Sequence, residues 1–303
     1  MNDTTFADHF KRAAVLLPIL AGVCWGIAGI FVRILEAEGL DNPTIVFTRT
    51  SVGTILLFLY IMFTDRGRLP VKVKDTPILA AISLFGSILL MIAYNYAVMH
   101  LSLAMAAILL CLAPVFVLLI SSPLLGEKIT RKKVVCMILA FAGCAMLSGI
   151  FEEGAVAFHG LGILMGLASA VLNALFILLS KLIAGRGYSS FTVTMYTSLF
   201  ATIMLAPFID WNALADFFSS GPFKGTVILI TQSVCTSLIP SMAYISAMKY
   251  VEASKTAILE SGAEPTSAML AGLIIFAEVP TLIGVCGMVI TIIALSVLAL
   301  DRA

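Results

Sequence analysis

The stretch LAPVF at residues 112–116, followed by GE at 126–127, decides the fold because nearly the same pattern returns later in the chain. The second copy reads AEPT at 263–266 and is followed by AE at 277–278. The two prolines are 151 residues apart, and so are the two glutamates. Both copies lie in hydrophobic segments long enough to cross a bilayer. The pattern therefore predicts a duplicated membrane protein, and duplicated halves with a site between them are a common transporter design.

The composition agrees with that class. Of the 303 residues, 61% are hydrophobic and only 12% are charged, which excludes a soluble globular protein. The gaps between hydrophobic segments are too short for a second, soluble domain. All six cysteines lie inside apolar segments and none forms a CxxC pair, so they are interpreted as small apolar residues rather than disulfides or metal ligands.

Hydrophobic segments of roughly twenty residues recur along the whole chain and predict an all-α membrane protein with ten transmembrane helices. The connectors between them are short and contain turn residues. The predicted spans are roughly 13–34, 43–63, 77–99, 103–121, 132–150, 160–182, 190–209, 225–248, 255–276 and 280–299.

Lysine and arginine are distributed unevenly between the two ends of these spans. With the N-terminus placed inside, fifteen of them lie on the inner side, only Arg33 and Lys224 lie outside, and Arg49 lies within a span. This bias places both termini in the cytoplasm. Five spans per half is an odd number, so the second half starts from the opposite side. We therefore expect two inverted five-helix repeats, at residues 1–150 and 151–303.

The chain resembles EamA-type members of the drug/metabolite transporter superfamily over nearly its whole length. The resemblance rests on the Pro-then-Glu ending of the fourth and ninth spans, on Trp25 and Gly26 in the first span, and on Pro43 followed by Arg49 in the second. It implies a multi-pass protein of the bacterial inner membrane. It also implies that small metabolites are transported, mostly outward, through a cavity between the halves, and it does not fix the substrate.

Two acidic residues lie within the predicted ninth span. Glu260 and Glu264 are four residues apart and share one helix face. A charged residue in mid-membrane is costly and usually faces water or a partner. In the functional reading, this face lines the cavity and meets a cationic or zwitterionic substrate, or carries a proton. In the structural reading, Glu260 reaches Lys249 or Lys255 and Glu264 accepts a hydrogen bond. We favour the functional reading for Glu264 and leave both open for Glu260.

For the other charged residues within or at the ends of the spans, structural roles are the favoured interpretation. Arg49 suits an anion site, but the favoured interpretation is that its side chain reaches outward to acidic residues of the first connector, Glu36, Glu38 and Asp41. Glu127 and Glu278 lie at span ends, where each is expected to cap the next helix in the chain.

Uncharged polar and aromatic residues within the spans complete the predicted substrate site. Asn173 lies on a stripe of small residues, which also suits close helix packing, and Trp25 suits either a cavity wall or space filling. The amides need hydrogen-bond partners in lipid, either from neighbouring helices or from substrate. With Glu260 and Glu264, the predicted substrate-binding residues are Trp25, Tyr94, Asn95, Asn173, Gln232 and Tyr244.

The sequence favours a secondary transporter of small polar metabolites such as amino acids, and not an enzyme. It contains no catalytic triad, HExxH or phosphate-binding loop pattern. We expect no catalytic residue, cofactor, metal or nucleic-acid partner. The expected partners are a small-molecule substrate and the lipid bilayer, while a coupling proton and a homodimer are left open. The alternatives are a membrane receptor or scaffold without transport, and an intramembrane enzyme.

Overall fold

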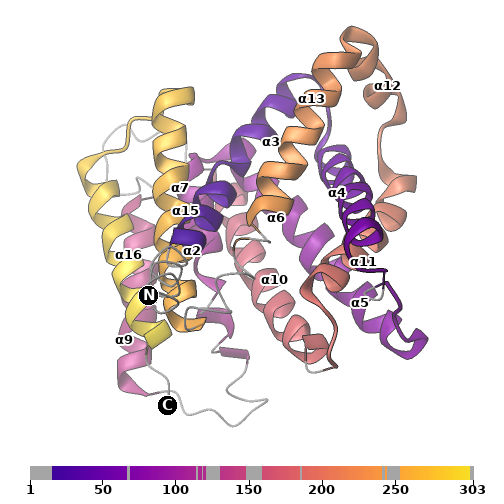
Figure 1. Ribbon diagram of the computed structural model, residues 1–303. Helices are drawn as coiled ribbons and strands as arrows, with labels where there is room; N and C mark the ends of the chain where they lie inside the picture. The colour runs from indigo at the N-terminus through magenta and orange to yellow at the C-terminus, as the bar shows by residue number, and fades with distance from the viewer. Residues whose placement is uncertain are drawn as a thin grey trace, which may run out of the picture.

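The computed structural model describes residues 16–66, 69–113, 115–117, 119–120, 130–147, 159–184, 186–240, 243 and 253–300. All regular structure within these residues is helical (Figure 1). The helices and short 3₁₀ or π segments (η) are α2 (Leu16–Gly26), α3 (Ala28–Ala37), α4 (Asn42–Thr64), η2 (Val73–Asp75), α5 (Thr76–Ile82), η3 (Ser83–Leu89), α6 (Leu90–His100), α7 (Leu103–Leu110), α9 (Arg131–Leu147), α10 (Gly160–Ala184), α11 (Ser190–Leu205), η4 (Ala206–Phe208), α12 (Trp211–Ser220), α13 (Pro222–Ser233), η5 (Val234–Leu238), α15 (Ala253–Phe276) and α16 (Leu282–Leu300).

Several helices begin at residues suited to that position. Asp41 precedes α4 and accepts a hydrogen bond from the backbone N–H of Thr44 at 3.2 Å, and Pro43 lies in the first turn. Ser102 precedes α7, and its Oγ accepts from the N–H of Met105 at 3.2 Å. These caps satisfy donors that have no partner within the helix. They fix where the second and fourth predicted spans start.

Five described stretches are helical, long and apolar enough to cross a membrane: Leu16–Ala37, Asn42–Thr64, Val73–His100, Gly160–Ser180 and Phe191–Phe208. They coincide with predicted spans one, two, three, six and seven. The shorter apolar helices Val134–Gly143, Gly262–Phe276 and Leu282–Val297 fall on predicted spans five, nine and ten, and α7 falls on predicted span four. The protein is an all-α integral membrane protein, whereas the number of ten spans stays a prediction.

The helices pack in long pairs. Helix α2 lies along α15, α9 along α16, α4 along α11 and α6 along α10. Figure 1 shows α9, α15 and α16 gathered at one side and α4, α5 and α11 at the other, with α10 between them. Glycines allow the closest approaches. A Cβ on Gly26 would lie 2.0 Å from Ser267 Oγ, and one on Gly143 would lie 2.4 Å from the carbonyl oxygen of Gly287.

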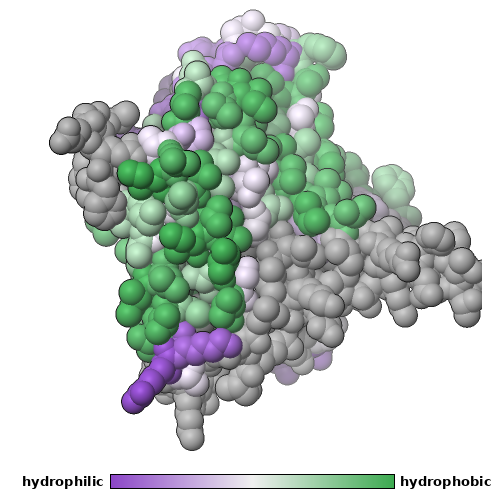
Figure 2. All heavy atoms as spheres, turned by 90° about the vertical axis from the view of Figure 1, so that its left-hand side faces the viewer, coloured by the Kyte–Doolittle hydropathy of each residue, from purple (hydrophilic) through white to green (hydrophobic). Residues whose placement is uncertain are grey.

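The outer face of α9 and α16 is hydrophobic. Figure 2 shows apolar side chains covering much of this side of the molecule, with hydrophilic residues at its ends. The exposed side chains there include Val135 and Ile138 of α9 and Ile283 and Ile293 of α16. A continuous apolar surface of this kind is favourable against lipid and unfavourable against water.

Two features interrupt the predicted spans. The first span is divided at Ile27 into α2 and α3, and the third and eighth spans contain the π-helical segments η3 and η5. The π segments start at Ser83 and Val234, which are 151 residues apart, the interval that separates the sequence copies. Helices of this type are rare, occur mostly as short segments within α-helices, and are frequent at functional sites.

Helix α12 was not expected from the sequence. It lies between the predicted seventh and eighth spans and begins after Asp210, whose Oδ1 accepts from two backbone N–H groups at 2.9 and 3.0 Å. Phe217 is its buried anchor, whereas Trp211 is 55% exposed. The signal was an Asp followed by apolar residues at helical spacing and then Gly221, a start and stop pattern typical of a short amphipathic helix.

Candidate functional site

The guanidinium of Arg49 on α4 is the centre of a polar cluster between the second and eighth predicted spans. Its Nη2 donates to the backbone oxygen of Thr236 in η5 at 2.7 Å, and its Nη1 contacts the sulfur of Met91 at 3.1 Å. In return, Ser233 Oγ donates to the backbone oxygen of Arg49 at 3.2 Å. The cluster therefore joins α4 to the α13–η5 helix by contacts in both directions.

The prediction that Arg49 reaches outward to the acidic connector is wrong. Asp41 caps α4, and Glu38 pairs with Lys224 at 2.6 Å. The side chain of Arg49 instead contacts Thr236 and Met91, both of which lie in neighbouring helical segments. Sequence position gave the depth of Arg49 in the span, but it could not give the direction of the side chain.

A small cavity adjoins Arg49. Its volume is about 10 Å³, room for about one water molecule. It is enclosed by residues of the first, second, third and eighth predicted spans: Ala28, Val32, Ile45, Val46, Arg49, Met91, Asn95, Gln232 and Thr236.

Two of the predicted site residues, Asn95 and Gln232, line this cavity. Asn95 is 3% exposed, and its Nδ2 donates to the Oδ1 of Asn42 at 3.0 Å. Asn42 in turn donates to the backbone oxygen of Ile92 at 2.8 Å. Gln232 is 2% exposed, and its Oε1 has no hydrogen-bond partner among the described residues. A buried amide oxygen without a donor is uncommon and marks a place where a further donor would be stabilising.

Glu264 lies in a separate, tightly packed region. It is 6% exposed on α15, and its Oε2 is 3.9 Å from the thiol of Cys111. The helix continues through Pro265, which follows it directly. The backbone oxygen of Glu264 accepts a hydrogen bond from Ser267 Oγ at 2.9 Å, and the same hydroxyl lies near the backbone of α2. The carboxyl group is thus held inside the bundle, between α15 and its neighbours α2 and α7.

Tyr94 lies between these two regions. It is 5% exposed and is within electrostatic range of both Glu264 and Arg49. Trp25 on α2 and Asn173 on α10 are partly buried, and neither lines the cavity beside Arg49. Two further predicted site residues are not placed: Tyr244 lies outside the described residues, and Glu260 belongs to α15 but its side chain is not described.

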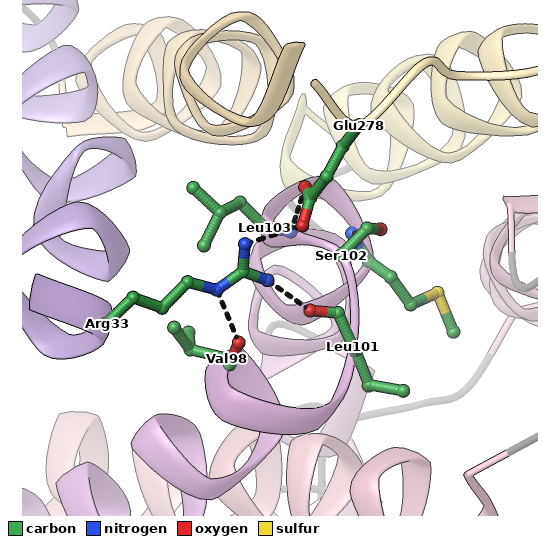
Figure 3. A network of polar contacts seen from close by, with 7 residues as sticks. Arg33, Val98, Leu101, Ser102, Leu103 and Glu278 are labelled. Atoms are coloured by element: carbon green, nitrogen blue, oxygen red, sulfur yellow. Dashed lines mark hydrogen bonds and ion pairs between the residues drawn. The ribbon is translucent and has the colours of Figure 1, made fainter. Parts of the chain in front are cut away.

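An ion pair missed by the sequence reasoning joins the first span to the ninth and fourth (Figure 3). Arg33 Nη1 contacts Glu278 Oε1 at 2.6 Å, and the same guanidinium donates to the backbone oxygens of Val98 at 2.9 Å and Leu101 at 2.6 Å. The ring of Phe276 lies 4.6 Å from its centre. Each nitrogen of this guanidinium therefore donates a hydrogen bond, and its central carbon lies over an aromatic ring.

Glu278 caps a helix, but not the one expected. Its Oε2 accepts from the N–H of Leu103 at 3.0 Å, at the start of α7. The next helix in the chain, α16, is capped by Thr281, whose Oγ1 accepts from Gly284 at 3.0 Å. The expectation that Glu278 caps the next helix is wrong, since chain order does not tell which helix ends meet. The counterpart expectation for Glu127 lies outside the described residues.

A third polar cluster lies where the segment before α5 meets the connection between α10 and α11. Asp75 is 1% exposed, forms an ion pair with Arg186 and accepts from the hydroxyl of Tyr188 at 2.6 Å. That hydroxyl also accepts from the N–H of Lys72 at 3.0 Å. The hydrogen bond to Asp75 raises the pKa of Tyr188 above the usual phenol range. Among the described residues, no cluster of three His, Cys, Asp or Glu side chains is placed to hold a metal.

The fold and its buried polar groups are those of a polytopic membrane protein with polar sites inside its helical bundle. The chain belongs to the EamA-like transporter family, whose sequence pattern matches residues 12–149 and again 160–300.

Among its relatives is an uncharacterized transporter of Archaeoglobus fulgidus, 25% identical over 92% of this chain and 95% of that one. The pseudopaline exporter CntI of Pseudomonas aeruginosa is 26% identical over 93% of this chain and 94% of its own length. A probable terminal-alkyne amino-acid exporter of Streptantibioticus cattleyicolor is 24% identical over 90% and 89%. One solved crystal structure shares the fold, with a TM-score of 0.60, 16% identity, and coverage of 94% of this chain and 96% of that one.

The relatives are named transporters and exporters, so membrane transport is the role that the family assigns to this chain.

Proposed function

We propose that the protein is a secondary transporter that exports small polar metabolites, amino acids or related compounds, by alternating access. The observation that carries the proposal is the presence of an arginine and a carboxyl group, Arg49 and Glu264, inside one membrane-spanning bundle. Such groups are costly in a bilayer and mark substrate or ion pathways. Two relatives named as exporters, one of an amino acid, support the substrate class and the direction.

The proposed mechanism uses two inverted five-helix repeats, residues 1–150 and 151–303. Support comes from the 151-residue interval, which separates both the Pro-Glu motifs and the starts of η3 and η5. Inverted repeats exchange conformations and so open a shared site to each side in turn. Both termini are proposed to be cytoplasmic, in a bacterial inner membrane. A reporter fused after Arg302 then behaves as cytoplasmic and one inserted at 152–154 as external.

The proposed site comprises Trp25, Tyr94, Asn95, Asn173, Gln232, Tyr244, Glu260 and Glu264. Within it, Glu264 binds either an amino or other cationic group of the substrate or a coupling proton. Its contact with Cys111 and its 6% exposure support this role, because a carboxyl group so enclosed gains most from a cationic partner.

Purified protein in proteoliposomes tests the proposal with a panel of amino acids, amines and sugars. We expect uptake of at least one amino acid above the level of empty liposomes. Glu264→Gln keeps the shape and removes the charge, and it is expected to abolish uptake or make uptake independent of pH. Absence of flux for the whole panel favours the receptor, scaffold or enzyme alternatives. Normal, pH-dependent flux in Glu264→Gln shows that the residue is only structural.

A further inference from the structure

We propose that Arg49 binds the carboxylate of the transported molecule and that Gln232 accepts a hydrogen bond from the amino or hydroxyl group next to it. The recognised unit is therefore an α-amino or α-hydroxy acid, which leaves Glu264 the coupling proton or a second cationic group of the substrate. This inference rests on the proposed transport function and names the part of the substrate that this cavity recognises.

The charge of Arg49 is the first reason. Its two hydrogen-bond acceptors are a backbone oxygen and a thioether, and neither is charged. None of the ion pairs formed among the described residues includes Arg49, since the three that occur involve Arg33, Arg186 and Lys224. A guanidinium inside a membrane protein is stabilised by an anionic partner. A substrate carboxylate supplies the partner that the described part of the chain does not.

The donors left on Arg49 are the second reason. A guanidinium carries five N–H groups in a planar fork that matches a carboxylate. Two nitrogens of Arg49 make the contacts to Thr236 and Met91, which leaves further N–H groups beside the cavity. The Met91 sulfur is a weak acceptor. A carboxylate is a far stronger one, so it displaces the Met91 contact at little cost.

Gln232 is the third reason, and it restricts the class of substrate that fits the cavity. Its Oε1 lines the same cavity and accepts no hydrogen bond from the described residues. A carboxylate alone does not satisfy an acceptor, whereas an ammonium or hydroxyl group on the adjacent carbon does. Arg49 and Gln232 together therefore suit a molecule with an acceptor pair and a donor on neighbouring atoms.

The size of the cavity indicates that substrate binds in a different conformation of the protein. A volume of about 10 Å³ admits one water molecule and no amino acid. The contacts of Arg49 with Thr236 and Ser233 hold α4 against the α13–η5 helix in this conformation. Substrate thus enters a second conformation in which these helices stand further apart, as alternating access requires.

The test measures transport by proteoliposomes of the twenty standard L-amino acids, with simple amines and sugars in parallel. Each amino acid that the wild-type protein moves is measured again as its amide, which lacks the carboxylate, and as its 2-hydroxy acid, which replaces the amine. The same compounds are measured with Arg49→Gln, Arg49→Lys and the exposed control Lys224→Gln. Lys224 is 67% exposed and lies outside the cavity.

We expect the wild-type protein and Lys224→Gln to prefer the amino acid to its amide by about ten- to a hundred-fold in apparent affinity, the value of one charge-assisted contact. Arg49→Gln loses that preference while it still moves the amide, and Arg49→Lys retains part of it. Equal transport of acid and amide by the wild-type protein overturns the inference.

Two other results also overturn it. One is an unchanged preference in Arg49→Gln, and the other is wild-type transport of amines or sugars but of no amino acid, which leaves the proposed transport function standing. If the wild-type protein moves nothing, the proposed function fails and the inference fails with it. If Arg49→Gln does not fold, the comparison of acid and amide in the wild-type protein decides. Transport of the 2-hydroxy acid separates a hydroxyl donor from an ammonium donor at Gln232.

Discussion

Replacing Glu278 with glutamine tests the ion pair that joins three predicted spans. The carboxylate serves two donors, Arg33 at 2.6 Å and the N–H of Leu103 at 3.0 Å. An amide of the same shape has one oxygen, so it can accept from only one of them. Its NH₂ group then faces the other donor.

The expected cost is about 2 kcal/mol of unfolding free energy. A hydrogen bond to a charged group contributes roughly 1.5–3 kcal/mol, and breaking a fully buried pair costs roughly 3–5 kcal/mol. The Arg33 and Glu278 side chains are 16% and 24% exposed, so solvent compensates for part of the loss. We therefore place the value within the first range and below the second, which applies to fully buried pairs.

The pair between Lys224 and Glu38 is a matched control. Its distance is also 2.6 Å, but its side chains are 67% and 31% exposed. Lys224→Gln is expected to cost about 0.5 kcal/mol or less, the usual contribution of a surface ion pair. Denaturant titration of both variants in the same detergent measures the difference. Equal costs for Glu278→Gln and Lys224→Gln would refute the reasoning from burial.

Two further variants test helix packing and capping. Gly26→Ala places a Cβ against Ser267 Oγ and forces α2 away from α15, so we expect a loss of about 1–3 kcal/mol in the same titration. The control is Gly262→Ala, whose Cβ would meet its nearest neighbour at 3.8 Å, and we expect it to be neutral or slightly stabilising because alanine favours a helix more than glycine does. His159→Ala removes the Nδ1 acceptor that receives the N–H of Gly162 at 3.0 Å in the first turn of α10, with an expected loss of about 1 kcal/mol, and an unchanged thermal midpoint would show that water replaces this cap.

Much of the architecture follows from the sequence because a bilayer restricts the possibilities. Backbone groups in lipid must be paired within a helix, so a long apolar run is enough to place one. The interruptions do not follow in the same way. The break at Ile27 and the π segments η3 and η5 depend on packing between helices, which a run of apolar residues does not reveal.

The candidate site was predicted only in part for a related reason. Asn95 and Gln232 were identified because buried amides in a span need partners, and both line the cavity. The predicted direction of the Arg49 side chain is wrong because the sequence gives its depth in the span and not the neighbouring helices that it faces. The pairing of Arg33 with Glu278 was missed since the two are 245 residues apart and meet only through tertiary structure.

The central claim is that a substrate site opens to one side of the membrane at a time. Counterflow in proteoliposomes tests this claim most directly. Vesicles are loaded with an excess of an unlabelled amino acid and diluted into a trace of the same compound carrying a label. An alternating-access carrier returns with labelled solute each time it releases unlabelled solute outside, so we predict a transient accumulation of label above its equilibrium level. A monotonic approach to equilibrium would indicate a channel, no entry would indicate a protein without transport, and either result would contradict the account.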